Sequence, residues 1–127
     1  MRFITTTGGL TMTTRYMFLI YGNEAEMAAA SKEEWDEMLQ AQRAWGAQVQ
    51  AAGATIVSGD ALGTTETSTT VRKGSGAPTI SEGPAAHTEE ALEGYYVIDC
   101  TDRAQALKFA NALPASTVEL RPVAPTM

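Results

Sequence analysis

The chain has 127 residues, 44% of them hydrophobic, and a formal net charge of −6. This length suits one domain with a buried core, and the acidic balance disfavours nucleic acids and anionic membranes as partners. The lone Cys100 rules out an internal disulfide, so nothing calls for an oxidising compartment and a cytoplasmic location is expected. No apolar stretch approaches the roughly 20 residues that span a bilayer.

Residues 1–13 are rich in threonine and glycine and show neither the alternation of a strand nor the period of a helix. We expect them to form a flexible extension without the apolar segment of a signal peptide. Because the patterned sequence begins just after it, Met12 is an alternative start. Residues 14–124 are expected to form a single domain, since no linker or repeat divides them.

The first patterned elements are a strand and a helix. The run R-Y-M-F-L-I-Y-G at 15–22 is continuously apolar and aromatic, which is typical of a strand buried on both faces. Ser31 and Glu34 form an S-x-x-E capping box at the start of the helix, and Gly53 ends it. Its apolar positions recur at helical spacing and are Trp35, Met38, Leu39, Trp45, Val49 and Ala52.

The second half of the chain is predicted to be mostly strands. Segments 54–60 and 67–73 are rich in β-branched residues, and a turn with two glycines and a proline leads to a short strand at 79–80. The run G-Y-Y-V-I-D-C at 94–100 predicts a further strand. Asp102 then caps a second helix, with Gln105 in the capping-box position, and T-V-E-L-R-P-V at 117–123 closes the sheet.

This order of elements predicts a ferredoxin-like α+β fold, with an antiparallel sheet and both helices on one face. Alternate residues of strand 15–22 point to opposite faces, and both sets are apolar: Tyr16, Phe18 and Ile20 on one, Met17, Leu19 and Tyr21 on the other. Two helices cover only one face, and monomers rarely expose so large an apolar patch. The sequence therefore predicts a homodimer with facing sheets.

The motifs R-Y-M-F-L-I-Y-G, S-K-E-E-W, A-A-G, T-T-V-R, E-G-P, G-Y-Y-V-I-D and V-E-L-R-P-V, in this order, resemble the YCII-related family in its DGPF subgroup. The resemblance runs from about Arg15 to Val123. It implies a dimeric α+β barrel built from ferredoxin-like subunits. Some DGPF members are encoded beside extracytoplasmic-function sigma factors, which implies a protein partner in transcriptional regulation as one role. Relatives resemble small enzymes for which a His-Asp pair has been suggested as the active centre.

The signature loop departs from the subgroup's pattern. Where that pattern reads D-G-P-F-A-E-T-K-E, residues 82–90 read E-G-P-A-A-H-T-E-E. Glu82 replaces the aspartate, Ala85 the phenylalanine and His87 a glutamate. On the first helix, Gln42 stands where many relatives carry a histidine. The His-Asp pair is therefore missing in that form.

Two residues of this loop are the candidate catalytic groups. Glu82 precedes a Gly-Pro turn, so it is either a turn residue that accepts backbone N–H bonds or a pocket carboxylate. His87 is either a solvated loop histidine or an imidazole that pairs with Glu82 to move a proton. One histidine, one cysteine and scattered acids lack the spacing of metal ligands, so no metal or other cofactor is expected.

Four residues are candidates for ligand binding. Gln42 falls on the apolar stripe of the first helix and must either bond the backbone of the sheet or line a cavity that holds water or ligand. Tyr95 and Tyr96 point to opposite faces of their strand, so at most one lines a pocket. Arg121 is expected either to pair with Asp99 or Glu119 of a neighbour or to bind an anionic ligand.

Taken together, the residues predict a small homodimeric domain that binds a small molecule in a cleft between the sheet and loop 81–93. The first alternative is a regulatory module that interacts with a partner such as a sigma factor. The second is an enzyme that uses Glu82 and His87 as an acid-base pair.

Overall fold

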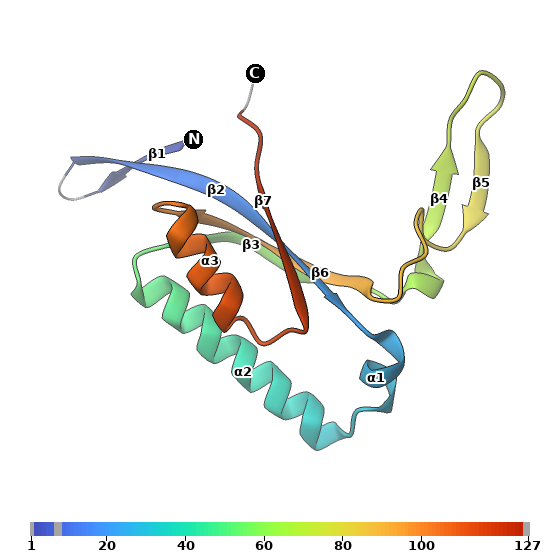
Figure 1. Ribbon diagram of the computed structural model, residues 1–127, viewed down its shortest axis with the longest axis horizontal. Helices are drawn as coiled ribbons and strands as arrows, with labels where there is room; N and C mark the ends of the chain where they lie inside the picture. Colours follow the sequence, from blue (N-terminus) through green and yellow to red (C-terminus); the bar gives the residue numbers. More distant parts are fainter. Residues whose placement is uncertain (1, 7–8, 126–127) are drawn as a thin grey trace.

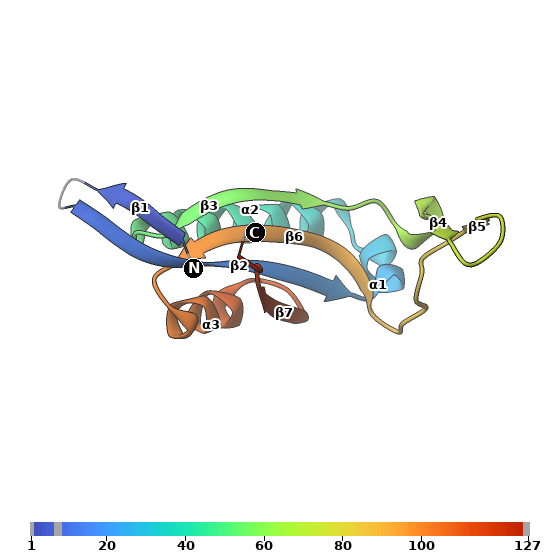
Figure 2. The same ribbon diagram turned by 90° about the horizontal axis from the view of Figure 1, so that it is seen from above.

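The computed structural model describes residues 2–6 and 9–125, with side chains from Thr13 onward. Its main sheet contains β2 (Gly9–Gly22), β3 (Thr55–Ala61), β6 (Ala91–Cys100) and β7 (Thr117–Pro122). β6 and β7 pair with opposite edges of β2, β3 pairs with β6, and all these neighbours are antiparallel. The helices α2 (Lys32–Ala51) and α3 (Arg103–Ala112) lie on one face of this sheet (Figures 1 and 2). The predicted ferredoxin-like α+β fold is confirmed.

Both long helices begin where the capping boxes predict. The Ser31 hydroxyl accepts a hydrogen bond from the Glu34 N–H at 3.1 Å, and the Asp102 carboxylate accepts one from the Gln105 N–H at 2.8 Å. These bonds satisfy N–H groups that have no partner within the helix. The short helix α1 (Glu24–Ala29), which the sequence analysis does not predict, is capped in the same way by Asn23.

Two strand pairs lie outside the central four strands. β1 (Arg2–Thr6) pairs with the first residues of β2, within the segment that is predicted to be flexible. Backbone pairing is not a measure of mobility, so that flexibility stays a prediction. After the short 3-10 helix η1 (Thr65–Thr67), β4 (Thr69–Arg72) and β5 (Thr79–Glu82) pair with each other in a separate two-stranded sheet.

The hydrophobic core lies between the sheet and the two long helices. Phe18 and Ile98 on the sheet are fully buried, as is Val49 on α2. The indole of Trp45 meets the ring of Phe18 edge-on, with 6.3 Å between ring centroids, and its N–H donates to the carbonyl of Phe109 on α3 at 2.9 Å. Trp45 therefore joins α2 to both the sheet and α3.

The first half of α2 diverges from the sheet and covers less of it than the helical spacing suggests (Figure 1). Trp35 and Leu39 belong to the predicted apolar stripe, yet both are exposed. Trp45 and Val49, further along the same stripe, are buried. The stripe thus reaches beyond the core that the sheet provides.

Candidate functional site

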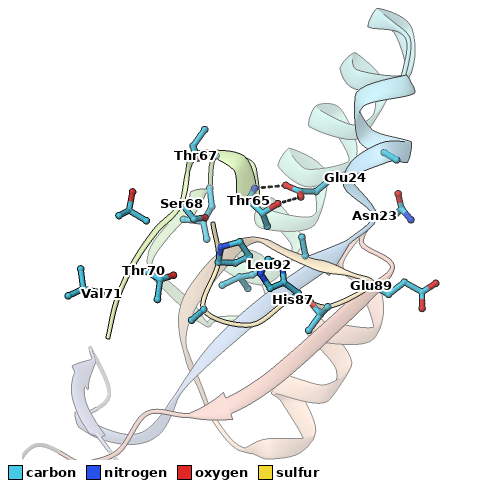
Figure 3. Close-up of a pocket in the computed structure, with 18 residues that line it drawn as sticks. Asn23, Glu24, Thr65, Thr67, Ser68, Thr70, Val71, His87, Glu89 and Leu92 are labelled. Atoms are coloured by element: carbon cyan, nitrogen blue, oxygen red, sulfur yellow. Dashed lines mark hydrogen bonds between the residues drawn. The ribbon is translucent and has the colours of Figure 1, made fainter. Parts of the chain in front are cut away.

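A groove of about 850 Å³ opens where the start of α1, the segment from η1 into β4, and loop 83–90 meet (Figure 3). Its walls are rich in hydroxyl groups, which belong to Thr65, Thr67, Ser68, Thr69, Thr70 and Thr88. Glu24, His87 and Glu89 supply its titratable groups, and Leu62 and Leu92 are among its apolar residues. No lysine or arginine is among the described residues that line it. The lining itself is therefore polar and without a cationic side chain, and the nearest fixed positive charge is that of Arg72, which bonds the carbonyl of the lining residue Ala85.

The signature loop is fastened to β4 and the residue before it by three hydrogen bonds. The N–H of Gly83 donates to the carbonyl of Ser68 at 2.8 Å, and the hydroxyl of Thr70 donates to the carbonyl of Gly83 at 2.7 Å. One nitrogen of Arg72 donates to the carbonyl of Ala85 at 2.7 Å. Gly83 has a φ of +106°, a conformation that favours glycine. The turn predicted from the Gly-Pro pair therefore holds one wall of the groove in place.

Glu24 connects the start of α1 to the opposite wall. Its carboxylate accepts hydrogen bonds from the hydroxyl of Thr65 at 2.5 Å and from the N–H of the same residue at 2.8 Å (Figure 3). These two bonds lower the pKa of Glu24 below its ordinary value because they favour the ionised form, and the bond from the Thr65 hydroxyl has the larger effect. The groove therefore holds a carboxylate that is already oriented by the protein.

The two candidate catalytic residues lie apart. His87 lines the groove and is exposed. Glu82 ends β5, is exposed, and accepts a hydrogen bond of 3.4 Å from Thr69 across the hairpin rather than lining the groove. Among the described residues, no hydrogen bond or ion pair joins the two side chains. The proposed acid-base pair is therefore not hydrogen-bonded within the described residues, and its role stays a prediction.

Gln42 and Tyr96 contact each other inside the domain. The hydroxyl of Tyr96 donates to the side-chain oxygen of Gln42 at 2.8 Å, and the Gln42 amide nitrogen donates to the carbonyl of Pro114 at 3.1 Å. The Tyr96 ring lies 4.9 Å from that of Trp45, and burial raises the pKa of the Tyr96 hydroxyl. Of the two alternatives for Gln42, the bonded structural amide is the one observed, although its backbone partner lies in the loop before β7 and not in the sheet.

Tyr95 and Arg121 lie on the opposite face of the sheet, the face without helices, which we call the open face. The hydroxyl of Tyr95 donates to Asp60 on β3 at 3.0 Å, and this bond raises the pKa of the tyrosine. Arg121 donates to Glu119 of its own strand at 2.9 Å. The six predicted site residues therefore occupy four separate places: the groove, the hairpin, the core and the open face.

The open face also carries a well-formed ion pair. Arg15 on β2 and Asp99 on β6 are partners in the strand register, and two guanidinium nitrogens donate to the two carboxylate oxygens at 2.7 and 2.9 Å. Asp99 is 6% exposed and Arg15 is 23% exposed. Hydrogen bonding to Asp99 raises the pKa of the Arg15 guanidinium.

Two carboxylates at the start of β6, Glu90 just before the strand and Glu93 within it, have opposite pKa shifts. Glu90 accepts hydrogen bonds from the hydroxyls of Thr117 at 2.7 Å and Ser116 at 2.8 Å, and these bonds lower its pKa. Burial, followed by the nearby charges of Glu24 and Glu90, raises the pKa of Glu93. Glu93 therefore opposes folding when it is ionised, whereas Glu90 favours it.

Replacing Glu93 by glutamine is expected to stabilise the protein at pH 7. Because the pKa of Glu93 is raised in the folded state, the folded protein binds this proton more tightly than the unfolded chain does. The wild type therefore loses stability as the pH rises from below the ordinary pKa of glutamate to above the raised pKa of Glu93. Glu93→Gln cannot ionise at this position, so its stability does not fall in this way. Urea unfolding from pH 4 to pH 8 measures the difference, which should vanish at the acidic end.

Glu90→Gln serves as the matched variant with the opposite sign. Its pKa is lowered in the folded state, so its stabilising effect is present above the ordinary pKa and lost as pH falls. This variant should be less stable than wild type at pH 7 and equal to it in acid. A Glu93→Gln variant that loses stability at pH 7 would contradict the expectation.

A model of the YCII-related domain matches residues 14–126 of this sequence. The chain belongs to the YCII-related domain family. It is also similar to an uncharacterised protein of Rhizobium meliloti (strain 1021), with 34% identity over 120 residues that cover 86% of this chain and 91% of the relative. In this YCII-related domain, no described helix combines the length and apolar character needed to cross a bilayer. The described residues also contain no group of three or more histidines, cysteines and acids placed to bind a metal ion.

Sequence reasoning missed the groove residues outside the signature loop of this YCII-related domain. Asn23 is a good N-cap residue, so the start of α1, and with it the position of Glu24 in the first turn, could have been recognised from the local sequence. The partner Thr65 left none, because it lies 41 residues further along and belongs to a threonine-rich segment without a period. Contacts of this kind depend on how β3 and β6 pair.

Proposed function

We propose that this YCII-related domain is a homodimer that binds a small polar molecule in the groove beside loop 83–90. The dimer is supported by the open face, where Met17, Leu19 and Val97 form an apolar strip across β2 and β6 that no helix covers. Such faces in stable proteins are covered by another layer. The open face of a second copy can be that layer, because it carries the same apolar strip.

The observation that carries the binding proposal is the groove itself. Hydroxyl groups on two walls can both donate and accept hydrogen bonds. With two carboxylates, one imidazole and no lysine or arginine among its described lining, the groove favours neutral polyhydroxylated molecules and small amines over phosphates and carboxylic acids. His87 adds a ring nitrogen that can donate to or accept from such a ligand.

A thermal-shift screen tests this binding with neutral polyols and small amines, and with carboxylic acids and inorganic phosphate for comparison. A ligand at a hundred times its Kd stabilises the folded protein by about 2.7 kcal/mol. We expect a compound of the first group to raise the melting temperature of the wild type and of Glu82→Gln, whose side chain lies outside the groove. The shift should be lost in His87→Ala.

Other outcomes separate the alternatives. No shift with any polyol or amine would contradict binding in the groove. Loss of the shift in both variants, together with turnover of the bound compound, would favour the enzyme that uses Glu82 and His87. The regulatory role with a protein partner stays a prediction from the resemblance to the DGPF subgroup.

A further inference from the structure

The hairpin formed by β4, β5 and the turn between them, residues 69–82, stands away from the rest of the domain and is called the arm. Among the described strands, β4 and β5 pair only with each other. The arm rises on the side of the sheet opposite α2 and α3, and from above it is seen nearly end-on (Figures 1 and 2). It therefore points in the same direction as the open face.

The arm exposes two apolar side chains that no described residue covers fully, and one of them, Val71, also lines the edge of the groove at the base of the arm. Val71 and Ile80 are register partners and so share one face of the hairpin, and they are 51% and 68% exposed. A two-stranded hairpin alone is marginally stable in water. Three hydrogen bonds to loop 83–90 hold the base of the arm, but they do not remove its two apolar side chains from solvent.

The charge of the arm is opposite to that of the molecule. Arg72 and Lys73 are the only adjacent cations in the sequence, and the chain as a whole has a net charge of −6. Lys73 forms no hydrogen bond or ion pair with any described residue. The open face carries the carboxylates of Asp60, which accepts a hydrogen bond from Tyr95, and of Glu119, which pairs with Arg121. A second copy of this acidic chain thus offers negative charge that complements the positive charge of the arm.

We propose that the arm reaches a second copy of this chain and holds it against the open face. The inference rests on the proposed homodimer and adds the contact that fixes the two sheets to each other. In each copy Val71 and Ile80 lie against the partner, and Arg72 and Lys73 lie near its carboxylates. The arm extends on the same side of the sheet as the open face, so a partner seated on the open face lies within its reach.

Sedimentation velocity on the full chain over a range of protein concentrations tests the apolar contact. The double variant Val71→Ser/Ile80→Ser should raise the dimer dissociation constant by about tenfold or more, since about 1.4 kcal/mol of lost contact produces that change. Leu107→Ser is the matched control, because Leu107 is exposed on α3 at the helical side. It should leave the constant unchanged. Circular dichroism confirms that each variant is folded.

Leu19→Glu separates this inference from the proposed dimer. It places a charge on the open face and should convert the protein to monomers. If Leu19→Glu dissociates the dimer while the double arm variant does not weaken it, the sheets pair without the arm and the inference is overturned. If the wild type is a monomer, or Leu19→Glu has no effect, the proposed dimer itself fails.

Carbodiimide cross-linking provides a second readout. Dimers mixed from ¹⁴N- and ¹⁵N-labelled chains are treated with carbodiimide, and the linked peptides are identified by mass spectrometry. Lys73 should link to aspartate or glutamate of the differently labelled copy. Lys108, which is exposed on α3, should give no such links. Equal yields for the two lysines, or none for Lys73, would overturn the charge contact.

Discussion

Phe18→Ala is expected to lower the free energy of unfolding by about 3–5 kcal/mol, the range for truncating a buried phenylalanine. Phe18 is fully buried at the centre of β2, which pairs with both β6 and β7. Its ring also supports the edge of Trp45, through which α2 contacts the sheet. The substitution therefore leaves a cavity where two layers meet, and the surrounding strands have little freedom to close it.

Urea unfolding followed by far-ultraviolet circular dichroism measures this loss at a fixed protein concentration. Tryptophan fluorescence is unsuitable, because Trp45 touches the substituted residue. Leu107→Ala is the control: this leucine is 44% exposed, so its removal should change stability by no more than about 0.5 kcal/mol. If Phe18→Ala lowers the free energy of unfolding no more than the control does, the Phe18 ring does not make a large contribution to the stability of the core.

Arg15→Met is expected to lower the free energy of unfolding by about 3 kcal/mol. The substitution leaves the carboxylate of Asp99, which is 6% exposed, without its two charged hydrogen bonds. Removing one partner of a buried ion pair costs roughly 3–5 kcal/mol, and the 23% exposure of Arg15 places this pair at the lower end. Urea unfolding at pH 7 and at two protein concentrations measures the effect and shows whether association contributes to it.

Two further variants identify the cause of that loss. Arg15→Met/Asp99→Leu replaces both charges by apolar groups and should be more stable than Arg15→Met alone, because no buried charge is left unpaired. Lys32→Met removes an exposed ion pair with Asp36 on α2 and should cost no more than about 1 kcal/mol. If Arg15→Met costs no more than Lys32→Met, the open-face pair is as weak as an ordinary surface pair.

The fold was largely predictable because its signals are local. The alternation along 15–22 separated Phe18 from Leu19 onto opposite faces of the sheet, and two capping boxes marked the starts of α2 and α3. Single-residue rules of this kind act within a few positions of the chain. The separate two-stranded sheet of β4 and β5 was harder, since its residues have the same β-branched character as a strand of the main sheet.

The candidate site was predictable only in part. The loop with His87 was found from its Gly-Pro turn, and it does form one wall of the groove. Gln42, by contrast, bonds a carbonyl 72 residues away at Pro114, and no pattern around either residue announces that contact. Alternation correctly separated Tyr95 from Tyr96 but could not say which of them would face the core.

The position of β6 in the sheet sets a delay during synthesis. β2 and β3 do not touch each other as strands, because β6 lies between them, and about 40 residues separate the end of β3 from the end of β6. At about 5–20 residues per second, a ribosome needs roughly 2–8 s to add them. During that time the apolar strand β2 has emerged without its central partner. Of the two long helices that pack on β2, α2 is the one that is already synthesised before residue 100 is available.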